Sequence, residues 1–334
     1  MSKHFAYDRS EKGLIIMETS TKNRQSMDTI QKIIEKAFGT VKVKNLEELK
    51  EGYFNIAYLV ELSDGRETIL KIAPPVDALV MSYEKNIMFS EVDSMNMVRG
   101  ILDIPVAEIL YYDNSHTLCE SDYFFMSKLE GNSFSSIMKD LSEEVKGQIN
   151  QLVGQYNYKI NEITGNKFGY YGLPDHQRDN WFDVFKNMIL TIIEDSKVFH
   201  IDFRIDINQM LYYLEQDKAI FEEVDKPRLI HWDLWPGNVF IEDNTITGLI
   251  DFERCLWGDI LMEYGFRIHE QNPDFLKGYG ITSFTENQKR RIIWYDIYLF
   301  LIMALECDYR NYETKDAYNW ATDTLTKRMA DLSL

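Results

Sequence analysis

The segment from Leu229 to Asp251 constrains this chain more than any other part of the sequence. It reads LIHWDLWPGNVFIEDNTITGLID and places His231, Asp233 and Asn238 in the order H-x-D-x-x-x-x-N. A hairpin-like stretch then leads into a short apolar strand that ends at Asp251. Phosphoryl transfer from a nucleotide uses such a set, in which one carboxylate faces the attacking hydroxyl while an amide and a second carboxylate hold Mg²⁺. The spacing therefore predicts a phosphoryl-transfer site.

Each of these residues also has an ordinary structural explanation. Their occurrence together favours a catalytic site over three separate structural roles. Asp233 lies in a polar loop, where a carboxylate either makes a turn hydrogen bond or accepts and orients a substrate hydroxyl. Asn238 follows a Pro-Gly turn and carries an amide oxygen of the kind that Mg²⁺ prefers. A carboxylate such as Asp251 after a buried strand is costly unless it is paired or bound to metal. We therefore expect Asp233 to be catalytic, Asn238 and Asp251 to bind metal, and His231 to brace the loop.

Lys71 is the candidate for contact with nucleotide phosphates, because it lies between Leu70 and Ile72 in an apolar strand. An outward-facing Lys of an alternating strand is the plainer explanation. Glu84 favours the role in phosphate binding over the outward-facing lysine, since a glutamate within an apolar helix face needs a cationic partner. We expect a Lys71–Glu84 pair, with Glu91 on the same face as the competing candidate. At helical spacing this face contains Val80, Glu84, Ile87, Met88, Glu91 and Met95.

The segment Lys50–Asn55 joins the first two expected strands and is placed to cover the phosphates of a nucleotide. We expect Phe54 and Asn55 to contact the nucleotide there. The segment has a single glycine, so it is not a G-x-G-x-x-G loop. The chain also lacks G-x-x-x-x-G-K-[ST], G-x-S-x-G and H-E-x-x-H, which leaves P-loop NTPases, serine hydrolases and zincins without support.

The pattern along the chain predicts an α+β protein of two lobes, the smaller one first. Residues 1–25 form a polar N-terminal extension, 26–129 a nucleotide-binding N-lobe with a small antiparallel sheet, and 130–334 a mainly helical C-lobe with the catalytic loop. Asp64-Gly65 between two apolar runs is a strong hairpin signal. The expected helices are 26–39, 78–98, 143–162, 179–194, 206–223 and two or three after 259, and the expected strands are 41–46, 56–62, 68–72, 107–112, 123–126 and the hairpin-like 239–251.

Composition narrows the partners. A formal net charge of −18 over 334 residues argues against nucleic acid and against anionic membrane surfaces. The longest apolar run, residues 297–305, is too short for the roughly 20 residues of a membrane span. Three widely spaced cysteines fit a reducing compartment, and the N-terminus lacks the apolar core of a signal peptide, so we expect a cytoplasmic protein. The acidity either serves solubility or forms an acidic cleft for a cationic substrate.

At this point the chain resembles the aminoglycoside phosphotransferase family, a branch of the kinase-like fold that also contains choline, homoserine and fructosamine kinases. The resemblance is carried by HWDLWPGN at 231–238, LIDFE at 249–253, and by Gly52–Tyr58, Lys71 and Glu84. It implies a bilobal kinase-like fold, ATP or GTP with Mg²⁺, Asp233 as base, Asn238 and Asp251 as metal ligands, and Lys71 with Glu84 at the phosphates. It also implies a hinge at 125–129, where backbone groups near Ser127 and Leu129 hold the purine.

Departures from protein kinases favour a small-molecule acceptor. Asp251 is followed by Phe-Glu rather than Phe-Gly, and no A-P-E segment follows. The stretch 192–225 carries nine acids and three bases, which would attract a cationic acceptor if it lined the cleft. An aminoglycoside is the first candidate, although His-Trp-Asp-Leu-Trp is nearer the fructosamine-kinase style than the His-Gly-Asp of many resistance enzymes. An amino sugar, a choline-like alcohol and a hydroxy amino acid remain open, as do a non-catalytic nucleotide-binding protein and a protein kinase.

Overall fold

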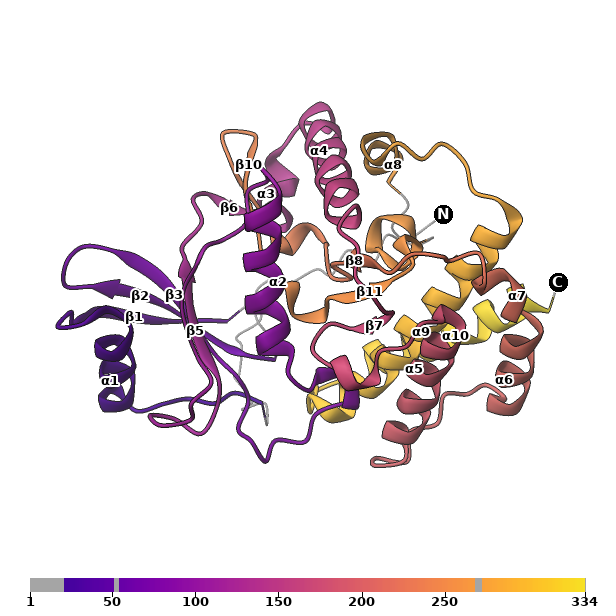
Figure 1. The fold of residues 1–334 in the computed structure, drawn as a ribbon, viewed down its shortest axis with the longest axis horizontal. Coiled ribbons are helices and arrows are strands. Elements are labelled where there is room, and N and C mark those ends of the chain that lie inside the picture. Colours follow the sequence, from indigo (N-terminus) through magenta and orange to yellow (C-terminus); the bar gives the residue numbers. More distant parts are fainter. Residues whose placement is uncertain (1–20, 51–53, 268–271, 334) are drawn as a thin grey trace.

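The computed structural model describes residues 21–50, 54–267 and 272–333. Two lobes are apparent, a smaller one built on a five-stranded sheet and a larger one that is mainly helical (Figure 1). This confirms the expected α+β architecture with the smaller lobe first. No helix in the described part of the chain is both long and apolar enough to cross a membrane.

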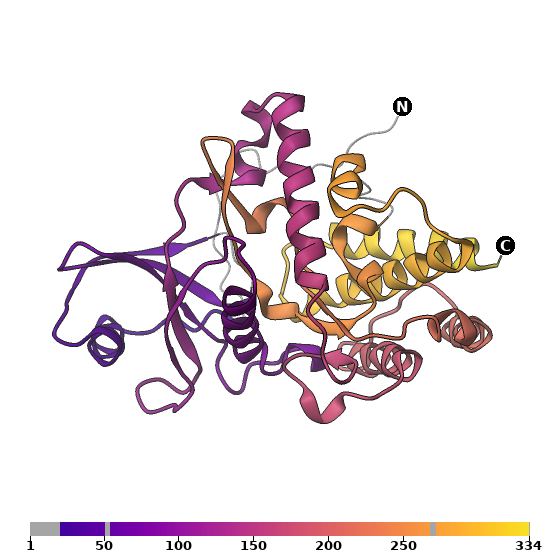
Figure 2. The same ribbon diagram turned by 45° about the horizontal axis from the view of Figure 1, so that its top comes forward.

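The N-lobe sheet is antiparallel, with the strand order β1-β2-β3-β5-β4. Helix α1 (Met27–Phe38) begins after Ser26, whose side chain accepts a hydrogen bond from the backbone N–H of Thr29, and ends at Gly39. It packs on one face of the sheet, while α2 packs on the other (Figures 1 and 2). The strands are β1 (Val43–Leu49), β2 (Ile56–Leu62), β3 (Glu67–Ile72), β4 (Ile109–Asp113) and β5 (Tyr123–Ser127).

The helix expected at 78–98 begins later than the sequence pattern predicts. A 3₁₀ turn, η1 (Ser82–Glu84), comes first, and helix α2 spans Ile87–Ile101. Between them Asn86 has a φ of 59°, in the left-handed region, which an α-helix cannot contain. The Glu84 carboxylate also accepts the backbone N–H of Met81 at 2.8 Å, so it caps the turn. Glu84 and Glu91 therefore do not share one helix face.

The C-lobe is built around α9 (Glu286–Tyr309), whose middle is fully buried. The helix expected at 206–223 is divided at Asp217 into two. The remaining helices are α3 (Phe134–Ile137), α4 (Glu143–Asn161), α5 (Trp181–Ser196), α6 (Ile207–Gln216), α7 (Lys218–Phe221), α8 (Pro273–Tyr279) and α10 (Asp316–Leu332). The 3₁₀ turns are η2 (Met138–Asp140), η3 (Pro174–His176), η4 (Pro236–Asn238), η5 (Phe252–Arg254), η6 (Ile260–Met262) and η7 (Tyr264–Phe266).

Two small sheets carry the segments that the sequence singles out. The expected hairpin is present, and it pairs with β6 in the order β10-β9-β6. The other sheet has the order β7-β11-β8 and leads directly into the loop that contains Asp233. Helix α2 of the N-lobe packs against η5 of the C-lobe, so the two lobes meet beside Asp251. The strands are β6 (Asn132–Ser133), β7 (Gly169–Tyr170), β8 (Arg228–Ile230), β9 (Val239–Glu242), β10 (Thr245–Leu249) and β11 (Leu256–Gly258).

Candidate active site

The loop after β8 is held by a buried glutamate. Glu263 accepts the backbone N–H of His231 at 2.8 Å and that of Trp232 at 3.1 Å. Asn157 and Asn161 of α4 also donate their side-chain amides to it, at 2.9 and 3.0 Å. Backbone N–H groups that would otherwise be unsatisfied inside the protein are thereby paired with a charged acceptor. The bonds to Glu263 thereby fix the loop conformation, including the left-handed φ of 61° at Trp232.

His231 links this loop to the end of β10. Its Nε2 lies 3.1 Å from the carbonyl oxygen of Ile250, and its Nδ1 accepts the backbone N–H of Asp233 at 3.3 Å. Burial lowers the pKa of His231, which favours the neutral ring with the proton on Nε2. The side chain therefore braces the loop, as the sequence predicts.

Asp233 and Asn238 are directly connected. The Asn238 side-chain N–H₂ donates to the backbone oxygen of Asp233 at 2.9 Å and to its carboxylate at 3.3 Å. Burial raises the pKa of Asp233 to about 7; Arg254 opposes the rise, and Asp251 and Glu253 add to it. The amide nitrogen of Asn238 is thus engaged within the loop, while its oxygen remains to ligate a cation.

Asp251 and Lys71 meet across the two lobes. Asp251 has a φ of 63°, an uncommon conformation for a residue other than glycine, and its carboxylate forms an ion pair with the Lys71 ammonium. The backbone N–H of Ile250 donates to the carbonyl oxygen of Asn238 at 3.2 Å, so Asp251 is also tied to the loop of Asp233. The structure therefore links Lys71, Asp251, Asn238 and Asp233 through a continuous set of contacts.

The predicted Lys71–Glu84 pair is wrong, and the competing candidate is the partner. Lys71 Nζ lies 2.6 Å from Glu91 Oε1 on α2. Glu84 instead forms a buried ion pair with Arg310, at the end of α9. The reason is the late start of α2, which places Glu91 in the helix opposite β3 and leaves Glu84 in the preceding turn. The structure thus gives Glu84 no contact with the lysine that was expected to bind phosphates.

The described end of the covering segment is attached to the C-lobe. The Asn55 side chain donates to Glu253 Oε2 at 2.9 Å, and the Phe54 ring lies 4.5 Å below the Arg310 guanidinium. Residues 51–53 of the same segment lie outside the described residues. Glu253, which replaces the glycine of protein kinases, is therefore a contact for the turn that contains Asn55.

The expected hinge joins the two sheets. Ser127 ends β5, and its backbone N–H donates to the carbonyl oxygen of Glu108 at 2.8 Å. Leu129 follows in the connection to β6 and packs on Gly248, where an added Cβ would lie 2.4 Å from the leucine side chain. Contact of Ser127 and Leu129 with a purine stays a prediction.

The two tryptophans of the loop differ. Trp232 is buried and stacks on Tyr298 at 5.5 Å between ring centres, so it is part of the core. Trp235 is 42 % exposed beside Asp233 and is the one available to an acceptor.

The acids of the 192–225 stretch mostly serve the C-lobe itself. Helices α6 and α7 lie at the end of the C-lobe away from the N-lobe (Figure 1). The stretch therefore lends little support to an acidic acceptor cleft. Its partnered acids are Glu194 (Lys197), Asp195 (Ser82), Asp202 (the Arg204 backbone N–H), Asp206 (the N-terminus of α6), Glu215 (Lys186), Asp217 (Arg290 and Trp294) and Glu223 (Arg291 and Asn287).

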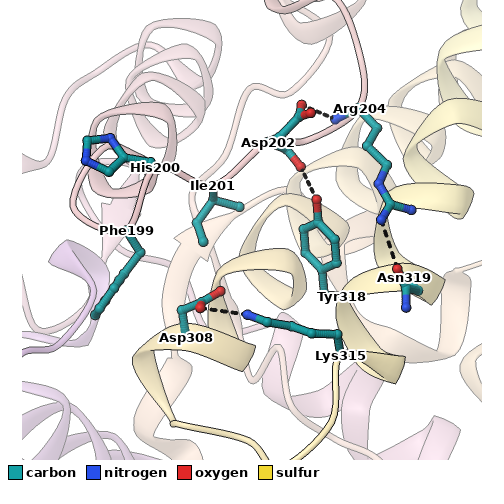
Figure 3. Close-up of a pocket in the computed structure, with 9 residues that line it drawn as sticks. All are labelled: Phe199, His200, Ile201, Asp202, Arg204, Asp308, Lys315, Tyr318 and Asn319. Carbon is teal, nitrogen blue, oxygen red and sulfur yellow. Dashed lines mark hydrogen bonds and ion pairs between the residues drawn. The ribbon is translucent and has the colours of Figure 1, made fainter.

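A hollow of about 370 Å³ lies between the α5–α6 connection and the start of α10. Figure 3 shows that polar groups lining it bond to one another: Lys315 donates to Asp308, the Arg204 side chain donates to Asn319, and the Arg204 backbone N–H donates to Asp202. None of the candidate site residues is among the described residues that line it. The hollow is therefore separate from the candidate active site.

Comparison with known proteins agrees with this geometry. The sequence model of the phosphotransferase enzyme family matches residues 45–291, which is well over half of the chain. The chain belongs to this family. A probable ketoamine kinase of Enterococcus faecium is 24 % identical over 75 % of this chain and 85 % of its own length. A subtelomeric hrmA-associated cluster protein of Aspergillus fumigatus is 29 % identical over 40 % of this chain, which spans only 25 % of that relative.

Solved structures show that this family member has the kinase-like fold. A putative aminoglycoside phosphotransferase of Ralstonia eutropha superposes with a TM-score of 0.64 at 10 % identity, over 93 % of this chain and 99 % of the other. Aminoglycoside phosphotransferase APH(4)-Ia gives 0.63 at 18 % identity, over 91 % and 99 %. The complex of APH(2″)-IIIa with GDP and kanamycin gives 0.61 at 15 %, over 90 % and 98 %.

Sequence reasoning missed several residues that lie around the candidate active site. Glu263 and Arg254 were not singled out, although Arg254 directly follows LIDFE and pairs with Glu306 at 3.1 Å. Lys22 was assigned only to a polar extension, yet its ammonium donates to the carbonyl oxygen of Asn55 at 2.7 Å. A buried acid shortly after the motif was an available signal for Glu263. No local pattern points to Lys22 or Arg310.

Proposed function

We propose that the protein transfers the γ-phosphate of ATP or GTP to a hydroxyl group of a small molecule. The observation that carries this proposal is the convergence of Asp233, Asn238, Asp251 and Lys71, which come from both lobes and are joined by direct hydrogen bonds and an ion pair. Family membership and the fold are consistent with it.

In this proposal Asp233 orients the acceptor hydroxyl and accepts its proton. Phosphoryl transfer depends mainly on positioning and charge neutralisation, so a fixed carboxylate beside the phosphate is the principal requirement. The pKa of Asp233, which burial raises to about 7, suits a group that exchanges a proton near neutral pH. Its connection to Asn238 holds the carboxylate in one orientation.

Asn238 and Asp251 would hold Mg²⁺. Mg²⁺ is usually bound by one or two protein oxygens together with phosphates and water, and this pair supplies one amide and one carboxylate oxygen. The side chain of Asp251 is 30 % exposed, so it is accessible from the space between the lobes. When bound, the ion neutralises phosphate charge. Lys71, which Glu91 holds at 2.6 Å, would add a fixed positive charge on the other side.

The acceptor we propose is a hydroxylated molecule small enough to reach Asp233 beside Trp235. Aminoglycosides remain candidates because structural neighbours are complexes with kanamycin and hygromycin B. A ketoamine or another amino sugar is an equal candidate, because a probable ketoamine kinase matches most of the chain. Most acids of the 192–225 stretch are paired within the protein, so they give little reason to expect a polycationic acceptor. Neutral sugars, choline-like alcohols and hydroxy amino acids therefore belong in the same screen.

The test is nucleotide consumption with ATP and with GTP across these acceptors, for the wild-type protein and for Asp233→Asn. We expect the substitution to reduce turnover at least about a hundredfold while nucleotide affinity stays near that of the wild type. Asp243→Asn, in the exposed β9–β10 turn, is the matched control and should leave turnover unchanged. Unchanged turnover in Asp233→Asn would refute the catalytic assignment.

A further inference from the structure

The end of α9 carries two charged residues that bond to other segments. Glu306 accepts a hydrogen bond from Arg254 Nη2 at 3.1 Å, and Arg254 belongs to η5, the turn directly after Asp251. Arg310 forms a buried ion pair with Glu84, which belongs to η1 before α2. The end of α9 is therefore bonded both to the turn that follows the expected metal ligand and to a turn of the N-lobe.

The pairing of Glu306 with Arg254 is not the one that the helix itself favours. The backbone N–H of Arg310 donates to the carbonyl oxygen of Glu306 at 2.8 Å, so these two residues are one helical turn apart. A glutamate four residues before an arginine forms a favourable pair on the surface of a helix. Here Glu84 takes the Arg310 guanidinium instead. The Glu306 carboxylate is thereby left for Arg254.

The Arg254 guanidinium lies near Asp233 without forming its ion pair there. Burial raises the pKa of Asp233, and the charge of Arg254 is the largest that opposes the rise. The ion pair that Arg254 does form is with Glu306, and its guanidinium also lies 5.9 Å from the centre of the Tyr83 ring. Tyr83 is buried and stacks on Tyr170 at 5.5 Å between ring centres, so the ring is held in place. Glu306 and Tyr83 together define the position of Arg254.

Without Glu306, Arg254 would need another carboxylate. Its side chain is mostly buried, and a mostly buried guanidinium without a counter-charge is costly. The other carboxylates whose charges act on Arg254 are those of Asp233 and Glu253, and Asp233 acts more strongly. Glu253 already accepts a hydrogen bond from the Asn55 side chain at 2.9 Å. Asp233 is therefore the expected second partner of Arg254.

We propose that Glu306 holds Arg254 away from Asp233 and so leaves the Asp233 carboxylate free for the acceptor hydroxyl. This inference rests on the proposed function, because it assumes that Asp233 receives the acceptor. Glu306 acts through Arg254, so it is a positioning residue and takes no part in proton transfer. The competing explanation is that the pair only fastens α9 to η5. The two explanations differ in what happens when Arg254 is removed as well, because a missing arginine cannot occupy Asp233.

The experiment compares the full chain with Glu306→Gln and with the double variant Glu306→Gln/Arg254→Met. Crystal structures of the wild type and Glu306→Gln locate the Arg254 guanidinium, which we expect to bond to Asp233 in the variant. The rate of Mg²⁺-ATP consumption, with water or an accepted substrate as acceptor, should fall about tenfold in Glu306→Gln, as for competition by one charge-assisted hydrogen bond. The double variant should recover most of the rate. Asp308→Asn, which removes the partner of Lys315 from the same end of α9, is the control and should keep the wild-type rate.

Three results would overturn the inference. An Arg254 guanidinium that stays against Tyr83 or turns to Glu253 in Glu306→Gln would show that Glu306 does not keep it from Asp233. A wild-type rate in Glu306→Gln would show that Asp233 stays available without Glu306. A double variant as slow as Glu306→Gln would assign the pair to fastening α9. A wild-type protein without turnover on water or on any acceptor of the screen would refute the proposed function together with this inference, whereas the three results in an active protein would refute this inference alone.

Discussion

Glu84 and Glu91 are buried glutamates from neighbouring segments of the N-lobe, and they serve different parts of the molecule. Glu91, on α2, holds Lys71 at 2.6 Å, whereas Glu84, in the turn before α2, holds Arg310 of the C-lobe. Glu84 is 4 % exposed and Glu91 is 0 % exposed, so burial does not distinguish them. A buried acid in an apolar pattern indicates that a cation is nearby, but the local backbone decides which cation it is.

The two carboxylates differ in how completely they are satisfied. One oxygen of Glu84 accepts from Arg310 and the other accepts the backbone N–H of Met81 at 2.8 Å. Glu91 has Lys71 on Oε1, while its Oε2 is buried without a hydrogen-bond partner among the residues that the structure describes. Burial raises the pKa of Glu91 above its usual value, while the Lys71 ammonium opposes the rise and Asp251 adds to it. Glu84, with both carboxylate oxygens bonded, fits a structural link between the lobes. Glu91, with one oxygen bonded, fits a site that binds a further ligand.

Replacement of Glu84 should have the largest effect, and it should be on stability. Glu84→Ala leaves the Arg310 guanidinium buried with its main counter-charge removed, which typically costs about 3–5 kcal/mol. Urea unfolding should show this loss as a lower midpoint. Asp77→Ala, an exposed acid in the linker before the same turn, is the control and should stay within about 0.5 kcal/mol of the wild type. An equal, small loss in both variants would remove the structural role assigned to Glu84.

Replacement of Glu91 should mainly affect turnover. Glu91→Gln keeps the size of the side chain and removes the charge, so the Lys71 ammonium should turn toward Asp251 and move from its position for phosphates. A displacement of about 1 Å in such a site can cost about a hundredfold in kcat. Steady-state kinetics on an accepted substrate and urea unfolding measure the two effects separately.

The control for Glu91→Gln is Asp93→Asn on the same helix, which removes a charge that is bonded to the Tyr171 hydroxyl and not to Lys71. Its kcat should equal that of the wild type. A Glu91→Gln variant with wild-type kcat would show that the pair with Lys71 is dispensable, and the contrast between the two glutamates would then fail.

The same contrast explains what could be predicted from the sequence. Asp233, Asn238 and Asp251 lie within one short segment whose turns and strands fix their relative positions, so their proximity follows from local spacing. The partner of Lys71 depends on where α2 begins, which in turn depends on the left-handed Asn86. Arg310 lies at the other end of the chain from Glu84, and the pair exists only because the end of α9 packs near η1, a tertiary fact without a local signal.

A third buried acid of the N-lobe, Asp113, sharpens the comparison because its pKa moves in the opposite direction. Burial would raise the pKa of Asp113, but hydrogen bonds from Lys36, Ser115 and Tyr123 outweigh it and hold the value well below normal. The distances are 2.5 Å from Lys36 Nζ, 2.6 Å from the Tyr123 hydroxyl and 2.8 Å from the Ser115 backbone N–H. A buried carboxylate with three donors thus remains charged, whereas Glu91, with one, does so less readily.

The Asp113 carboxylate should therefore stabilise the fold in a pH-dependent way. A folded-state pKa below the unfolded value of about 3.9 contributes stability that is present above pH 4 and is lost as the pH falls below it. Asp113→Asn should lower the free energy of unfolding by about 1–3 kcal/mol at pH 7, and the difference from the wild type should shrink between pH 4 and pH 3. Thermal unfolding across this range measures it, with Glu120→Gln, an exposed acid of the adjacent loop, as control. A difference that stays constant from pH 7 to pH 3 would mean that shape rather than charge makes Asp113 stabilising, and the donors around it would then not account for its contrast with Glu91.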